Sequence, residues 1–97
     1  MEREIVTYVQ SLSSEPINKK ARFQNVAFYR HLAIFLLKFK NPSLSYRKVV
    51  HFIGFDDYTV VPYACKKFEG RMKVDSRFRR EIERHIISIN QLICQPS

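Results

Sequence analysis

Residues 45–67 read SYRKVVHFIGFDDYTVVPYACKK, and this stretch predicts the motif around which the other helices pack. Ser45 is a favourable N-cap residue for a short helix. Gly54 is the residue expected at the left-handed position that closes such a helix. Two acidic residues, Asp56 and Asp57, then precede a second helix. Two helices joined by a tight turn predict a helix-turn-helix, a motif that places a helix in a DNA groove.

The start of the second helix is ambiguous because of Pro62. If Asp56 or Asp57 is the N-cap, Pro62 falls inside the helix and removes a backbone hydrogen bond, at a cost of about 3 kcal/mol. If Thr59 is the N-cap, Pro62 falls in the first turn, where a backbone N–H has no intrahelical partner. Both starts stay open at this point, and the helix is expected to continue to about residue 72.

Apolar residues at helical spacing predict further helices around this motif. Asn25 is the expected N-cap of a central helix, and Asp75 or Ser76 is the expected N-cap of the last helix. We therefore expect a compact all-α domain of about five helices. The expected single domain covers residues 1–97 and divides into an N-terminal helix (1–16), a basic connector (17–25), the central helix (26–40), the helix-turn-helix (45–72) and a C-terminal helix (75–93).

The central helix combines an apolar surface with a few basic side chains. Apolar residues occur on most of its sides, which is typical of a helix packed by several neighbours. Arg30, Ile34 and Lys38 follow one another at i, i+4 spacing and share one line along the helix. We therefore expect Arg30 and Lys38 to contact a phosphate backbone from one ridge.

The charge of the chain is strongly positive and unevenly placed. The 97 residues carry a formal net charge of +8, with a pI near 9.8. Such a chain is attracted to polyanions. No Asp or Glu occurs over residues 17–55, although that span holds eight basic side chains. The pattern favours a binding face over a role in solubility or in binding a partner with acidic groups. The eight are Lys19, Lys20, Arg22, Arg30, Lys38, Lys40, Arg47 and Lys48.

No constellation of residues points to catalysis or to a cofactor. Cys65 and Cys94 are far apart and lack metal-site spacing with any of the three histidines, His31, His51 and His85. Two glycines are too few for a phosphate-binding Gly-rich loop. We therefore expect a protein that is not an enzyme and that needs no cofactor.

The sequence also predicts the compartment. No apolar run approaches the roughly 18 residues of a membrane span. The first residues, Met1 to Glu4, do not have the form of a signal peptide. Two isolated thiols suit a reducing environment. We expect a cytoplasmic protein with no membrane partner and no small-molecule substrate.

Three short stretches resemble one known family at matched spacing. Residues 30–36, RHLAIFL, resemble its Arg-Gln-(Ile/Met)-Ala-Met-x-Leu motif. Residues 57–61, DYTVV, resemble its Asp-His-Thr-Thr-Val signature, and residues 63–67, YACKK, resemble its His-Ala-Cys-Arg-Lys continuation. The family is the C-terminal DNA-binding domain of the bacterial replication initiator DnaA, whose helix-turn-helix belongs with the Trp-repressor-like folds. The resemblance covers about residues 22–68 firmly and reaches residue 93 with weaker matches.

The resemblance implies contacts to the DNA backbone and to the minor groove. Arg22 matches the basic residue that enters the minor groove, and Arg30, His31 and Lys38 match contacts to phosphates. Phosphate contacts of this kind fix the register of a protein on the duplex. Two further basic residues point outward from the first helix of the motif and join the expected DNA-binding set, Arg47 and Lys48.

The resemblance places base reading at the start of the second helix of the motif. Asp57, Tyr58 and Thr59 match residues that read bases in the major groove, and Val60 would enter the groove beside them. An Asp can accept a hydrogen bond from a cytosine amino group, and a Thr methyl can pack on a thymine methyl. Tyr58 stands where the family has His, and Val60 where it has a second Thr, so the reading end differs from the family pattern.

We therefore expect sequence-specific binding of double-stranded DNA without the ATPase motor of a full initiator. The expected role is regulation of replication or transcription, in the cytoplasm at the nucleoid, with a protein partner as a further option. The alternative is a degenerate DnaA-like domain that binds a protein partner, or that binds DNA without sequence preference.

Overall fold

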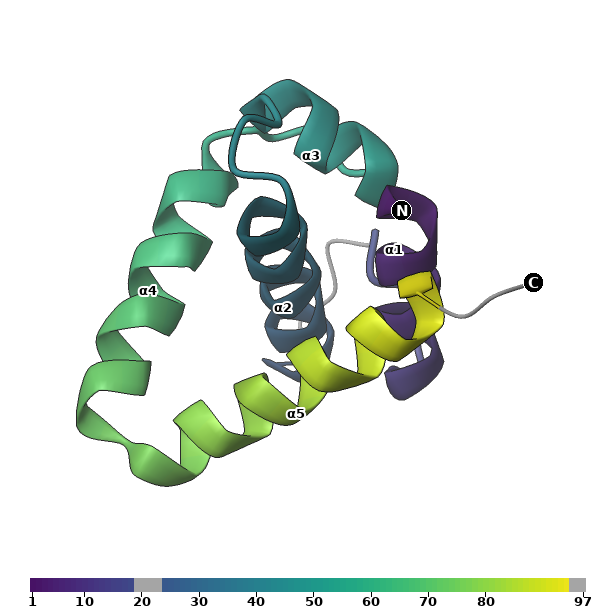
Figure 1. Cartoon of the computed structure of the whole chain (residues 1–97). Coiled ribbons are helices and arrows are strands. Elements are labelled where there is room, and N and C mark those ends of the chain that lie inside the picture. The colour runs from purple at the N-terminus through teal and green to yellow at the C-terminus, as the bar shows by residue number, and fades with distance from the viewer. Residues whose placement is uncertain (19–23, 95–97) are drawn as a thin grey trace.

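The computed structural model describes residues 1–18 and 24–94, and within these ranges every regular element is a helix (Figure 1). The expected all-α fold of about five helices is confirmed. The basic connector residues 19–23, and with them Arg22, lie outside the described residues. The helices are α1 (Glu2–Leu12), α2 (Gln24–Lys40), α3 (Tyr46–Ile53), α4 (Val60–Val74) and α5 (Ser76–Cys94).

Helix α2 lies in the middle of the bundle, and α1, α3 and α4 all pack against it (Figure 1). Its residues 32–37 are buried without interruption, as expected for a helix that is apolar on most sides. Two expectations about α2 are wrong. Asn25 is not its N-cap, because the helix already begins at Gln24. Arg30 and Lys38 do not share an exposed ridge, because Ile34 between them is 0% exposed and faces the core.

The short helix α3 has a side-chain cap at its start and a left-handed residue at its end. The Ser45 Oγ accepts a hydrogen bond from the Lys48 N–H at 3.2 Å. Gly54 has a φ of 82°, and both its N–H and that of Phe55 donate to the Val50 carbonyl at 2.9 Å. A Cβ at Gly54 would also lie 3.3 Å from the Asn18 amide nitrogen. The left-handed backbone therefore favours glycine here, and the Asn18 side chain would have to shift slightly to admit a Cβ.

Thr59 is the N-cap of α4, which settles the ambiguity about Pro62. Pro62 is the third residue of the helix, so the N–H that it lacks would have had no partner inside the helix. A start at either aspartate is wrong, and Asp57 and Tyr58 belong to the turn. The helix runs to Val74, slightly beyond the expected end.

A cluster of four phenylalanine rings packs α4 and α5 against α2. The Phe68 ring centroid lies 5.2 Å from that of Phe78 and 5.6 Å from those of Phe28 and Phe35. Helix α5 begins after Asp75, whose Oδ1 accepts from the Phe78 N–H at 3.1 Å. The cluster therefore packs the C-terminal half of α4 against α2 and α5, while Val61 buries the first turn of α4 in the same core.

Candidate nucleic-acid interface

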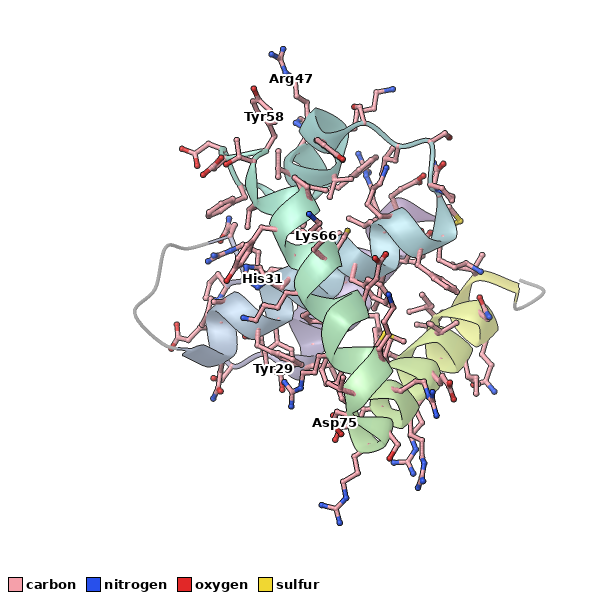
Figure 2. The ribbon with its side chains drawn as sticks, turned by 90° about the vertical axis from the view of Figure 1, so that its left-hand side faces the viewer. Tyr29, His31, Arg47, Tyr58, Lys66 and Asp75 are labelled. Atoms are coloured by element: carbon pink, nitrogen blue, oxygen red, sulfur yellow. The ribbon has the colours of Figure 1, made fainter. Side chains whose placement is uncertain are left out.

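The start of α3 and the turn before α4 together form one end of the molecule. Figure 2 shows Arg47 and Tyr58 side by side at this end. Arg47 and Lys48 come from α3, and Asp57, Tyr58 and Thr59 come from the turn; all five side chains are exposed. We call these five residues the tip. The fold therefore gathers half of the expected DNA-binding set at a single protruding position.

Within the tip, a cation–π contact joins α3 to the turn. The Arg47 guanidinium carbon lies 5.4 Å from the centroid of the Tyr58 ring. Such a contact at an exposed site contributes about 0.5–1 kcal/mol. It presents a positive charge and an aromatic ring together, and both can contact a nucleic acid.

The Asp57 side chain shapes the backbone that leads into α4. Its Oδ1 accepts hydrogen bonds from the Thr59 N–H at 3.0 Å and from the Thr59 hydroxyl at 2.5 Å. The Val61 N–H donates to the Tyr58 carbonyl at 3.1 Å, which closes the turn. Asp57 therefore orders the turn through its own side chain, as Asp commonly does.

Val60 does not join the tip. It is half-buried and packs against the hydrophobic core as the first residue of α4. A branched apolar side chain at this position is stabilised by the core, which explains why it can stand where the related family has a threonine. Four residues were expected to enter the major groove. The structure exposes Asp57, Tyr58 and Thr59 but not Val60.

Arg30 lies 7% exposed beneath the helix-turn-helix. Its Nε donates to the Ile17 carbonyl at 2.8 Å, and its guanidinium carbon lies 4.3 Å from the Phe55 ring centroid. Phe55 directly follows Gly54 in the turn. Arg30 thus connects the segment after α1 to the turn between α3 and α4. The contact of Arg30 to a phosphate stays a prediction. The structure shows in addition that Arg30 stabilises the turn through Ile17 and Phe55.

His31 is 8% exposed at the α2–α4 interface, where Figure 2 shows it behind α4. Its ring lies edge-on to the Tyr63 ring, with centroids 5.8 Å apart. Burial, reinforced by the positive charges of Lys67 and Arg30, lowers the pKa of His31 to about 4. Its buried Nδ1 has no hydrogen-bond partner among the residues that the structure describes. His31 is therefore neutral at pH 7, and a phosphate contact from it stays a prediction.

Lys38 holds the loop between α2 and α3. Its Nζ donates to the Pro42 carbonyl at 2.7 Å and to the Leu44 carbonyl at 2.9 Å. The same nitrogen lies 5.4 Å from the Tyr46 ring centroid, at the first residue of α3. Lys38 therefore positions α3, whether or not it also contacts a phosphate.

The exposed side of α4 adds candidates that the sequence analysis did not include in the DNA-binding set. Tyr63 is 60% exposed, and the Lys67 Nζ lies 5.9 Å from its ring centroid. Lys66 also projects from this side of α4, below Tyr58 in the view of Figure 2. Steps of three or four residues from Thr59 reach Tyr63, Lys66 and Lys67, so helical spacing was the signal that could have found them.

The described ranges 1–18 and 24–94 show neither a helix able to cross a membrane nor a cluster of three or more metal-binding side chains. What they show is a small all-helical domain of the helix-turn-helix class, with a basic and aromatic end at the start of its second motif helix.

Comparison with known proteins confirms the resemblance drawn from the sequence. The chain is similar to the chromosomal replication initiator protein DnaA of Bacteroides fragilis, with 36% identity over 72 residues, which is 74% of this chain. It is similar to DnaA of Lachnoclostridium phytofermentans with 31% identity over 87 residues, or 90% of this chain, and to DnaA of Roseiflexus castenholzii with 29% over 80 residues. The chain is DnaA-like, in a manner consistent with the C-terminal region of that initiator.

The match concerns a small part of each relative. The chain spans 15% of the Bacteroides fragilis protein and 19% of the Lachnoclostridium phytofermentans protein. No family model matches the chain, and neither does any solved structure.

Proposed function

We propose that the chain binds double-stranded DNA and reads sequence with the tip. The single observation that carries the proposal is the exposure of Asp57, Tyr58 and Thr59 at the start of α4, directly beside Arg47 of α3. In helix-turn-helix proteins the first residues of the second helix contact base edges in the major groove. DnaA-like identity over most of the chain supports the same use of this element.

Each tip residue has chemistry suited to a groove. Asp57 can accept from a cytosine amino group, and the Thr59 methyl can pack on a thymine methyl. Tyr58 brings a ring and a hydroxyl, and Arg47 can make a bidentate contact to a guanine or to a phosphate.

Contacts to the DNA backbone would come from Lys48 of the tip and from the exposed side of α4. Lys48 on α3 and Lys66 and Lys67 on α4 are exposed and positively charged. They would fix the register of the duplex without reading its sequence. The expected contacts of Arg22, Arg30, His31 and Lys38 belong to this group, with Arg30 and Lys38 also supporting the protein itself.

We infer that this protein acts by binding rather than by catalysis, as a regulator of replication or transcription in the cytoplasm, at the nucleoid. The net charge of +8 supports binding to DNA, because a positively charged protein is attracted to a polyanion.

Selection from random duplexes tests the proposal. Enrichment of a motif by the wild-type chain, and a different motif for Tyr58→His, would support base reading by the tip. Arg47→Gln should weaken binding about tenfold, whereas Arg79→Gln on α5 removes the same charge far from the tip and should leave the affinity within twofold.

The alternative function predicts other outcomes of the same selection. Salt-sensitive binding with no enriched motif would identify a DNA binder without sequence preference. No binding to any duplex would contradict the proposal and favour a protein-interaction module.

A further inference from the structure

The first half of α5 carries a row of arginines that the tip does not use. Arg77, Arg80 and Arg84 follow one another at i, i+3 and i+7, so they lie on one face of the helix. All three are exposed, and together with Glu81 they line one open depression. We call the three arginines the α5 ridge. The opposite face of α5 is held in the core by Phe78.

The ridge arginines have no ion-pair partner among the described residues, in contrast to their neighbours. Arg79 lies 3.9 Å from the Glu83 carboxylate, and Arg71 lies 3.7 Å from that of Asp75. Glu81 shares the depression, so the ridge keeps a surplus of two positive charges. Exposed arginines without partners retain their guanidinium groups for an external anion.

The ridge lies at the other end of the molecule from the tip. Helix α4 separates the two sites, and its 15 residues span about 22 Å. Figure 1 shows α3 and the start of α5 at opposite ends of α4, and Figure 2 shows Asp75, just before α5, far below Arg47. The ridge is therefore a surface separate from the tip, and it shares no residue with it.

The chemistry of the depression favours a phosphate backbone over a protein partner. Only charged side chains line it, whereas a stable protein interface needs an apolar centre. Arginine binds phosphate bidentately. From Arg77 to Arg84 the ridge is about 10.5 Å long, which equals about three base-pair steps measured along the axis of a duplex.

We propose that the α5 ridge binds the phosphate backbone of a second DNA duplex, so that one chain bridges two DNA segments. The proposal rests on the proposed function, since the tip must hold the first segment. Bridging brings separate sites on a chromosome together, which binding at one surface cannot do.

A two-duplex capture experiment tests the proposal on the whole chain. One duplex is immobilised, the protein is bound to it, and a second, fluorescent duplex is added at low salt. The wild-type chain should capture the second duplex, and the capture should fall steeply with added salt. The ridge variant R77Q/R80Q/R84Q should bind the first duplex within about twofold and lose about tenfold or more of the second capture.

A control variant, R3Q/K73Q/R79Q, loses the same three charges from exposed positions off the ridge. It should retain the second capture. Equal loss in both triple variants would overturn the ridge as a site, because only overall charge would then matter.

Other outcomes separate this proposal from the proposed function. Failure of the wild-type chain to bind the first duplex would contradict the proposed function itself. Binding of the first duplex without capture of the second would overturn bridging alone, as would unchanged capture by the ridge variant. Ridge-dependent binding of a poly-glutamate peptide, without capture of a second duplex, would overturn it in favour of an acidic protein partner.

Discussion

The guanidinium of Arg30 lies over the ring of Phe55, with 4.3 Å between the guanidinium carbon and the ring centroid. One residue belongs to the central helix and the other to the turn of the helix-turn-helix. Because the Arg30 Nε also donates to the Ile17 carbonyl, this one side chain ties three segments together. A basic residue expected at the DNA surface therefore also determines where the turn sits.

Arg30→Ala should destabilise the protein as well as weaken DNA binding. The change removes a charged hydrogen bond and a cation–π contact, which together contribute about 2–4 kcal/mol. Urea unfolding at pH 7 measures the loss. Arg30→Lys keeps the charge but not the planar guanidinium, so it should recover only part of the stability. Full stability of Arg30→Ala together with lost DNA affinity would show that the residue acts at phosphate alone.

Gly54→Ala and Gly70→Ala should change stability in opposite directions. At Gly54 the left-handed φ of 82° opposes any side chain, and the Asn18 amide nitrogen would lie only 3.3 Å from an added Cβ. The substitution at Gly54 should therefore cost about 1–2 kcal/mol.

Gly70 serves as the matched control for this pair. It is exposed within α4 and a Cβ there meets no atom within 4 Å, so alanine should stabilise the protein by about 0.5–1 kcal/mol. Thermal unfolding of both variants measures the difference. Equal effects at the two positions would contradict the assignment of Gly54 as the obligatory turn residue.

Pro62→Ala should change stability by less than about 1 kcal/mol, in the destabilising direction. With Thr59 as the N-cap, Pro62 breaks no helical hydrogen bond, and its replacement only increases the freedom of the unfolded chain. A proline inside the helix would instead cost about 3 kcal/mol, so its removal would stabilise the protein by that amount. Denaturant unfolding of the two proteins therefore tests the start of α4.

His31 should make the stability of the protein depend on pH between about 6.5 and 4. The histidine pKa is about 6.5 in an unfolded chain and about 4 in the folded one, so the unfolded chain binds the proton first as the pH falls. Stability is then complete above pH 6.5 and is lost toward pH 4, by up to about 3 kcal/mol.

His31→Leu should remove this component, as measured by the free energy of unfolding at several pH values. A shallower slope should remain, because burial also lowers the pKa of His85. His51→Gln is the control, since His51 is exposed on α3. The same pH profile in wild type and His31→Leu would show that His31 is not buried in its neutral form.

Local signals in the sequence were enough to locate the helix-turn-helix and to predict the class of fold. Ser45 and Gly54 act through hydrogen bonds to residues within one turn, so their types alone indicate where α3 begins and ends. The apolar periodicity of α5 likewise predicts its buried face, with Phe78, Ile82 and Ile89 in the core. The turn at Gly54 also indicated that residues 57–59 lie at the start of the second motif helix, and the structure shows them exposed there.

Tertiary packing decided which of the basic and apolar candidates reach the surface. Spacing placed Arg30 and Lys38 on one line, but only the neighbouring elements bury Ile34 between them and engage both cations with backbone carbonyls. The sequence by itself determined the helices, the turn and the positive charge, because these depend on residue type and near neighbours. The structure identified Thr59 as the N-cap of α4, and tertiary packing decided the burial of Arg30 and His31, because burial depends on which distant segments pack together.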